Sequence, residues 1–372
     1  MSLLNLEIIS SNLSSNLSSN LSSNSDDSFI DSLINLDNDD NLNGGLNKKN
    51  FLDINSNKDN NKDNNICALN NVKKTCMPKN ILNSLANLYK VKNIKDSATI
   101  INTLSNKNDV CRLKPNSKQK ELCILEQIKK DNNHSGSNSN PELVNKNIST
   151  IINKYIITYF KPVTKQLHKN YWINNTEIDN IQYQFQKKFK GYYYSYIHMI
   201  DLEMYKPQNN ELLLNHEKIL NIKDINFKNE LNKLNNYLKY NGDLKYYGIV
   251  CNTDTSQGSG IHWFSIFIDF TNNPITIEYF NSSGYDIKND DYGNNFKNFF
   301  INLADDLTFN KKNCKFIKVT NIEHQRSDTA NCGSYSLYYI WKRLNNTSYE
   351  YFKDNQIIDE DMEKFRSFLW RK

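Results

Sequence analysis

The sequence predicts an α+β fold, in which strands cluster in the second half of the chain and helices flank them. Four short segments are rich in aromatic and β-branched residues and are bounded by Gly, Asn or Pro, as strands are: 245–252, 262–270, 275–282 and 314–322. Four others have apolar residues at helical spacing: 176–189, 292–306, 332–344 and 358–370. The sequence "TNNP" (271–274) predicts a hairpin-like turn between the second and third strands. We expect Thr176 to cap the first of these helices.

The chain divides by composition into three parts. Residues 1–65 are a Ser/Asn-rich, low-complexity head that we expect to be disordered, because such residues have little apolar surface to bury. Residues 66–144 are predicted to be a small helical arm that ends in a polar linker, with helical patterns near 78–91, 96–105 and 118–130. Residues 145–372 are predicted to form the globular core domain.

Composition narrows the possible functions. The net charge of +5 is spread along 372 residues without a dense Lys/Arg block, which favours a solvated surface over a specific nucleic-acid site. No apolar run is long enough for a membrane span. The amino terminus lacks the basic start and long apolar core of a secretory signal.

The chain has seven cysteines, and none of them forms a Cys-x-x-Cys motif or a zinc-like cluster with the six histidines. We therefore expect no metal site. We also expect reduced thiols in a cytosol-like compartment.

Cys332 is a candidate nucleophile. It follows the polar stretch "HQRSDTAN" and opens the apolar, aromatic-rich run "CGSYSLYYIWKRL", which is predicted to be a helix. A thiol at the start of a helix lies where the helix dipole favours a negative charge. The alternative is a buried structural cysteine, and the choice between them depends on finding a base.

His262 is the candidate base. It opens a predicted strand directly after the glycine-bearing loop "SQGSG", and strand alternation places it on the face of Phe264, Ile266 and Ile268. Asn281 ends the next strand, so an antiparallel pairing would bring it beside His262. Its carboxamide could then hold the imidazole, as the third member of a Cys-His-Asn arrangement. Taken alone, His262 is more simply a satisfied strand-edge histidine and Asn281 a turn residue.

Acyl transfer also needs hydrogen-bond donors for the developing oxyanion. The backbone N–H of Cys332 is one candidate, and the side-chain amide of Gln325, seven residues earlier, is the second. The alternative for Gln325 is a solvated loop residue.

The order His262, Asn281, Gln325, Cys332 resembles that of the adenain-type cysteine proteases, which include SUMO-specific and viral polyprotein proteases. Within this clan the chain most resembles the polyprotein-processing core proteases of African swine fever virus and its giant-virus relatives. The similar stretches are "NTDTSQGSGIHWFSIFIDF", "IEYFNSSG", "VTNIEHQRS", "CGSYSLYYI" and "DEDMEKFR". The resemblance covers most of 170–370 and implies an adenain/SUMO-protease-like fold.

The resemblance also implies roles and partners. His262 would be the base, Asn281 its orienter, Cys332 the nucleophile and Gln325 the oxyanion donor, and Trp263 would shelter the pair. The implied activity is a thiol endopeptidase that cleaves viral structural polyproteins after Gly-Gly during virion assembly. The implied locations are the virion and the host cytoplasm, and no cofactor is needed. The alternatives are a deconjugating protease for SUMO or ubiquitin-like proteins, and a catalytically silent scaffold.

Overall fold

The structure, a computed structural model, describes residues 66–70, 75–89, 91, 96–134, 152–165, 167–168, 170–195, 198–200, 232–238, 243–255, 258–288, 291–307 and 314–371. The chain forms two compact units, which divide between Lys161 and Pro162. The predicted disordered head (1–65) and the predicted boundary at 144/145 lie outside the described residues.

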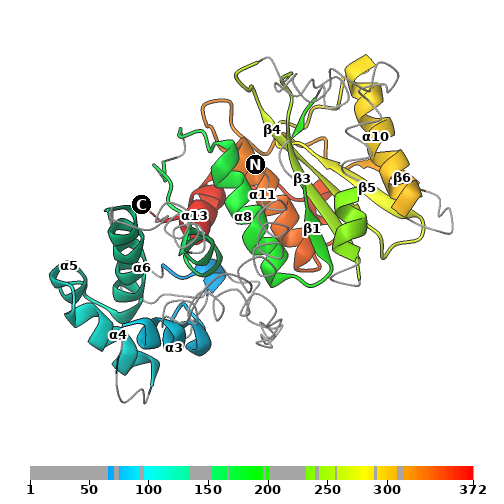
Figure 1. The fold of residues 1–372 in the computed structure, drawn as a ribbon. Coiled ribbons are helices and arrows are strands. Elements are labelled where there is room, and N and C mark those ends of the chain that lie inside the picture. The colour runs from blue at the N-terminus through cyan, green and yellow to red at the C-terminus, as the bar shows by residue number, and fades with distance from the viewer. Residues whose placement is uncertain are drawn as a thin grey trace, which may run out of the picture. The chain divides into compact units, whose positions relative to one another are not determined.

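The first unit is helical, as the sequence predicted. Its elements are η2 (Ala68–Asn70), α3 (Lys79–Leu88), α4 (Ser97–Asn106), α5 (Asp109–Arg112) and α6 (Ser117–His134), with a further helical segment over 152–159 (Figure 1). Each predicted helix of the arm is therefore confirmed. Their apolar faces form one core, in which Leu85, Ile100 and Leu125 are fully buried.

The arm contains two disulfides, so the expectation of reduced thiols is wrong for four of the cysteines. Cys67 is bonded to Cys76 and Cys111 to Cys123, with Cα atoms 5.2 and 5.5 Å apart. The sequence motifs that we considered are closely spaced pairs, whereas these partners are 9 and 12 positions apart and are brought together only by folding. Cys251, Cys314 and Cys332 are thiols.

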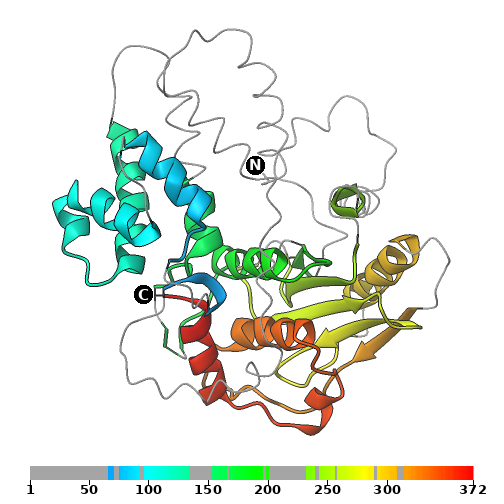
Figure 2. The ribbon, with the colours of Figure 1, turned by 90° about the horizontal axis from the view of Figure 1, so that it is seen from below.

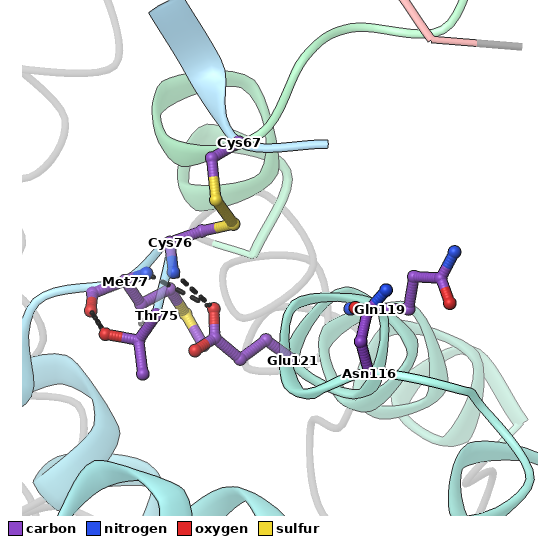
Figure 3. Close-up of a disulfide and its surroundings, with 7 residues drawn as sticks. All are labelled: Cys67, Thr75, Cys76, Met77, Asn116, Gln119 and Glu121. Atoms are coloured by element: carbon purple, nitrogen blue, oxygen red, sulfur yellow. Dashed lines mark hydrogen bonds between the residues drawn. A yellow bond between two sulfur atoms is a disulfide. The ribbon is translucent and has the colours of Figure 1, made fainter. Parts of the chain in front are cut away.

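A buried carboxylate lies beside the first disulfide (Figure 3). Glu121 of α6 is fully buried and accepts hydrogen bonds from the backbone N–H groups of Cys76, at 2.8 Å, and Met77, at 3.3 Å. Burial raises the pKa of Glu121 to about 7, against the opposing effect of these two bonds. This contact holds the segment that leads into α3 against α6.

The second unit is built on one six-stranded sheet. The strands are β1 (Tyr192–Tyr194), β2 (His198–Met199), β3 (Tyr246–Asn252), β4 (Trp263–Asp269), β5 (Ile275–Phe280) and β6 (Cys314–Lys318). Their order is β1-β3-β4-β5-β6, with β2 also on β3. The β3–β4 and β4–β5 pairs are antiparallel, and the other pairs are parallel. All four strands predicted from the sequence are confirmed, and the predicted turn at 271–274 joins β4 to β5.

Helices cover both faces of this sheet (Figures 1 and 2). On one face, α10 (Asp291–Leu307) packs its phenylalanines against the side chains of Phe264, Ile266 and Ile268, in agreement with the predicted alternation of β4. On the other face lies α11 (Cys332–Leu344), which contacts β4 and β3. Strand β4 is consequently buried along its whole length.

Buried charges tie α11 to the sheet. Arg343 donates from Nε to Glu278 of β5 at 2.7 Å and from Nη2 to Asp269 of β4 at 3.1 Å. Tyr339 of α11 donates to the same Glu278 carboxylate at 2.6 Å. These bonds fix the position of the helix that begins at Cys332 relative to β4 and β5, whose ends adjoin His262 and Asn281.

Helix α8 (Asn175–Lys188) begins at a different cap from the predicted one. Asn174, not Thr176, accepts the N–H of Glu177, while the Glu177 carboxylate accepts the N–H of Asn174. This reciprocal capping box satisfies two N–H groups, whereas Thr176 lies inside the first turn. The chain ends in α12 (Tyr351–Asp354) and α13 (Asp359–Leu369), and α13 packs on α11.

Candidate active site

His262 and Asn281 meet at one end of the sheet. His262 immediately precedes β4, and Asn281 immediately follows β5, its antiparallel neighbour. The imidazole Nε2 lies 2.7 Å from Oδ1 of Asn281. The pairing expected from the sequence is therefore present in the structure.

The contacts of Asn281 fix which ring nitrogen carries the proton. Its Oδ1 accepts the backbone N–H of Ser283 at 3.0 Å, and its Nδ2 donates to Oη of Tyr279 at 2.9 Å. Because Oδ1 is an acceptor, Nε2 of His262 must donate the hydrogen bond that joins them. The other ring nitrogen, Nδ1, is then unprotonated in the neutral ring and can take a proton.

Cys332 occupies the first position of α11 and is 1% exposed. The backbone N–H groups of Cys332 itself, Gly333 and Trp263 donate toward its sulfur. Trp263 is the residue directly after His262, so this contact brings the sulfur to the strand end that carries the imidazole. The structure thus places Cys332 beside Trp263, which adjoins His262 in the chain.

Close packing at Gly333 supports the same placement. A Cβ atom at Gly333 would lie 2.9 Å from Cδ1 of Ile173 and 3.1 Å from Cδ1 of Trp263. The indole N–H of Trp263 in turn donates to the carbonyl oxygen of Ile173 at 3.2 Å. The first turn of α11 can approach the Trp263 ring this closely only because residue 333 lacks a side chain.

Burial favours the neutral form of both the Cys332 thiol and the His262 imidazole. It raises the pKa of the Cys332 thiol, against the backbone N–H groups and the charge of Arg366, which favour the thiolate. It also lowers the pKa of His262, against the opposing effect of the bond to Asn281. The sequence indicated that the start of a helix would favour a thiolate at Cys332. In the structure, burial opposes this effect, so the position at the helix start does not by itself make Cys332 a thiolate. At neutral pH the pair consists of a thiol and an imidazole.

Gln325 lies on the loop that leads to α11. Its Oε1 accepts from Oγ of Ser282 at 3.0 Å, and its Nε2 donates to the carbonyl oxygen of Thr329 at 2.7 Å. Ser282 directly follows Asn281, so its hydrogen bond to Gln325 connects this loop to the segment that carries Asn281. The bond to Thr329 uses one of the two Nε2 hydrogens, and the oxyanion role of Gln325 stays a prediction.

The sequence did not single out Ser283 or Asp359, which also support the site. Oγ of Ser283 lies 3.2 Å from Nε2 of His262. The buried carboxylate of Asp359, at the start of α13, accepts from Thr329 Oγ1 at 2.9 Å and Asn331 Nδ2 at 2.7 Å. The only sequence signal for Asp359 is its place in "DEDMEKFR", one of the stretches that resemble the viral proteases.

The described residues show no cluster of three or more His, Cys, Asp or Glu side chains placed to hold a metal ion. Within the same residues, none of the helices has both the length and the apolar character that crossing a membrane requires.

Comparisons with known proteins bear on this site. No protein-family model matches the chain. Over 125 residues the chain is 45% identical to the SUMO-1 cysteine protease of African swine fever virus, a match that covers 34% of this chain and 44% of that protein. The cysteine protease of the Badajoz strain matches to the same extent. These matches span less than half the length of the curated relatives.

The crystal structure of the African swine fever virus protease superposes with a TM-score of 0.51, at 24% identity, over 82% of this chain and 95% of that chain. The chain has the fold of this viral cysteine protease. A weaker similarity, with a TM-score of 0.35 at 12% identity, extends to the SUMO protease Ulp1. The superposition on the viral protease confirms the predicted α+β, adenain/SUMO-protease-like fold class.

Proposed function

We propose that the chain is a cysteine endopeptidase, with Cys332 as nucleophile, His262 as base and Asn281 as the residue that orients the base. The observation that carries this proposal is the 2.7 Å contact of His262 with Asn281 beside a sulfur that accepts the N–H of Trp263. The similarity to viral cysteine proteases over 125 residues supports the same chemistry.

The mechanism follows from the protonation states of the pair. Nδ1 of His262 takes the thiol proton as Sγ of Cys332 bonds to the peptide carbonyl carbon. The C–N bond then breaks, and the imidazolium returns the proton to the departing amine. Water, deprotonated by the same nitrogen, hydrolyses the thioester and regenerates the thiol. Asn281 keeps the ring oriented throughout, because its Oδ1 holds the Nε2 proton.

The tetrahedral intermediate carries a negative oxygen that needs donors. The first N–H groups of a helix have no partner within the helix, and those of Cys332 and Gly333 are directed toward the reacting sulfur. We assign the remaining donor to the Nε2 of Gln325, through the hydrogen that Thr329 does not use.

The proposed cleavage site is the bond after a Gly-Gly pair in viral structural polyproteins, during virion assembly. This proposal is supported by the resemblance of the sequence to viral polyprotein proteases and by the similarity to a viral relative named a SUMO-1 cysteine protease.

A peptide assay tests this function. Wild-type protein should cleave a Gly-Gly-X peptide after the second glycine, and a matched Ala-Ala-X peptide should be cut far more slowly. Cys332→Ala should remain folded and lose at least about 10³-fold in rate, because members of a catalytic unit fail together. Equal rates for wild type and Cys332→Ala would refute the proposal.

The name of the relative also favours a second candidate, a protease that removes SUMO-like proteins from conjugates. The same experiment distinguishes the two when a SUMO fusion is added as a substrate. A higher kcat/KM for the SUMO fusion than for the Gly-Gly-X peptide would favour deconjugation. Cleavage of neither substrate would favour a catalytically silent scaffold.

A further inference from the structure

Arg366 of α13 is a buried charge that forms no ion pair with a carboxylate among the described residues. Arg366 is 1% exposed, and its Nε has no hydrogen-bond partner among the described residues. None of the ion pairs in that part of the chain includes it. The other buried arginine of this unit, Arg343, binds two carboxylates. A buried guanidinium normally requires such compensation.

The hydrogen bonds of Arg366 are made to the backbone around the candidate nucleophile. Its Nη2 donates at 2.8 Å to the carbonyl oxygen of Ala330, two residues before Cys332. Its Nη1 donates at 2.8 Å to the carbonyl oxygen of Tyr171 and at 3.2 Å to that of His168. These acceptors are neutral, so they orient the guanidinium without cancelling its charge.

The segment that contains Tyr171 reaches the other side of the nucleophile. Two residues later, Ile173 packs over Gly333 and accepts the indole N–H of Trp263. Arg366 therefore links the segment before Cys332, which contains Ala330, to the segment that packs over Gly333, which contains Tyr171. Its position follows from the same backbone that positions the sulfur.

The charges that act most strongly on Arg366 come from four groups. They are the Cys332 thiol, Glu177 at the start of α8, Glu363 one turn earlier on α13, and Tyr171. Glu363 is exposed, and the Glu177 carboxylate already accepts hydrogen bonds from the N–H of Asn174 and from Oη of Tyr171. Asp359, the buried carboxylate two turns earlier on α13, accepts from Thr329, Asn331 and the N–H of Arg326, and no ion pair among the described residues joins it to Arg366. The thiolate of Cys332 is thus a buried negative charge that Arg366 can stabilise.

We infer that Arg366 is a positioning residue whose fixed positive charge stabilises the thiolate of Cys332 as it forms. This inference rests on the proposed role of Cys332 as nucleophile. Burial of the sulfur opposes loss of its proton, and the charge of Arg366 acts in the opposite direction. Arg366 lowers the barrier to proton transfer to His262 without touching the substrate.

The test is the rate at which iodoacetamide alkylates Cys332 as a function of pH, followed by mass spectrometry of the peptide that contains it. Only the thiolate reacts, so the midpoint reports the pKa of the thiol. Arg366→Met should move the midpoint upward and slow alkylation at pH 7 by about tenfold or more, the effect of one lost neighbouring charge. Arg366→Lys, which keeps the charge, should restore most of the rate.

Arg326→Gln is the matched control. It also removes a positive charge near Cys332 in sequence, but Arg326 is exposed and paired with Asp328 at 2.7 Å. Its alkylation profile should coincide with that of the wild type. Equal slowing by Arg366→Met and Arg366→Lys would overturn the inference in favour of a packing role, and so would an unchanged profile in Arg366→Met.

A second measurement needs no change at Arg366, in case those variants do not fold. In a His262→Ala background, the ratio of iodoacetate to iodoacetamide rates should be several-fold higher at Cys332 than for the uncharged model thiol N-acetylcysteine amide, because a nearby cation attracts the anionic reagent. Cys314 is unsuitable as the reference, since Lys311, Lys312 and Lys315 adjoin it in the sequence. Equal ratios for Cys332 and the model thiol would overturn the inference. If wild-type Cys332 shows neither peptide cleavage nor enhanced alkylation, the proposed function itself fails. If the protein cleaves the peptide but these charge effects on alkylation are absent, the proposed role of Arg366 is refuted and the proposed function stands.

Discussion

Nε2 of His262 lies 2.7 Å from Oδ1 of Asn281, although 19 positions separate the two residues in the chain. The antiparallel pairing of β4 and β5 creates this contact, because it places the start of one strand beside the end of the next. The contact fixes the tautomer of His262, and from it follows the assignment of Nδ1 as the base.

Removal of the orienting oxygen should impair catalysis more than folding. Asn281→Ala should lower kcat by about 10²–10⁴-fold, the usual contribution of a correctly positioned base. Asn281→Asp keeps an acceptor at the same place and should retain much of the activity. The measurement is steady-state cleavage of the Gly-Gly-X peptide, with thermal unfolding as a check. Similar losses in both variants would show that the acceptor oxygen is not what matters.

The pH dependence of cleavage should reflect a buried base. Burial lowers the pKa of His262 below its ordinary value of 6.5, so the neutral, proton-accepting form persists to more acid pH than in a free histidine. We expect kcat/KM to be retained at pH 6.5 and to fall as the pH drops through the lowered pKa. An acid limb with its midpoint above 6.5 would contradict the burial of the base.

Gly333→Ala should disturb the site through a steric clash. Alanine favours helices by about 1 kcal/mol over glycine, but the added Cβ would lie 2.9 Å from Cδ1 of Ile173. We expect a net loss of about 1–3 kcal/mol in the free energy of unfolding, as in other overpacked cores, together with reduced cleavage.

Two companion variants sharpen this prediction. Ile173→Val removes the Cδ1 atom and should recover part of the loss in a Gly333→Ala background. Ser334→Ala, one position further along α11, removes a buried Oγ that has no partner among the described residues, so it should be neutral or stabilising. The measurement is denaturant unfolding of these three variants and the wild type. If Gly333→Ala proves more stable than wild type, the close approach of α11 to Trp263 is not present.

The buried charge cluster under α11 should be needed for stability. Glu278→Ala leaves the guanidinium of Arg343 without its main partner and should cost about 3–5 kcal/mol of unfolding free energy, as loss of one member of a buried pair does. Tyr339→Phe removes only the hydroxyl that donates to the same carboxylate and should cost about 1.5–3 kcal/mol. A cost for Glu278→Ala no larger than that of Tyr339→Phe would show that the ion pair contributes little.

The strands and most helices were predictable because their signals are local. Alternation along 262–270 predicted that Phe264, Ile266 and Ile268 share a face, and these side chains pack together against α10. The meeting of His262 with Asn281 was also predictable, because a short turn joins consecutive strands. Both depend on the period of a strand and the length of a connection, which the sequence contains.

The features that were missed depend on tertiary contacts. Cys67 and Cys76 are 9 positions apart and form a disulfide that no short motif announces. The partners of Arg366 lie 36 to 198 positions away, so its burial could not be inferred from its own helix. The cap of α8 was assigned to Thr176 instead of Asn174 because either residue type can cap a helix and the sequence does not say which begins it.

The central claim is that Cys332 attacks the substrate with the help of His262, and a covalent probe tests it directly. A peptide that ends in Gly-Gly and carries a vinyl sulfone in place of the scissile carbonyl should form a single adduct, which tryptic mass spectrometry places on Cys332. The adduct should form at least about 10²-fold more slowly in His262→Ala. An adduct on Cys251 or Cys314 instead, or an unchanged rate in His262→Ala, would contradict the account.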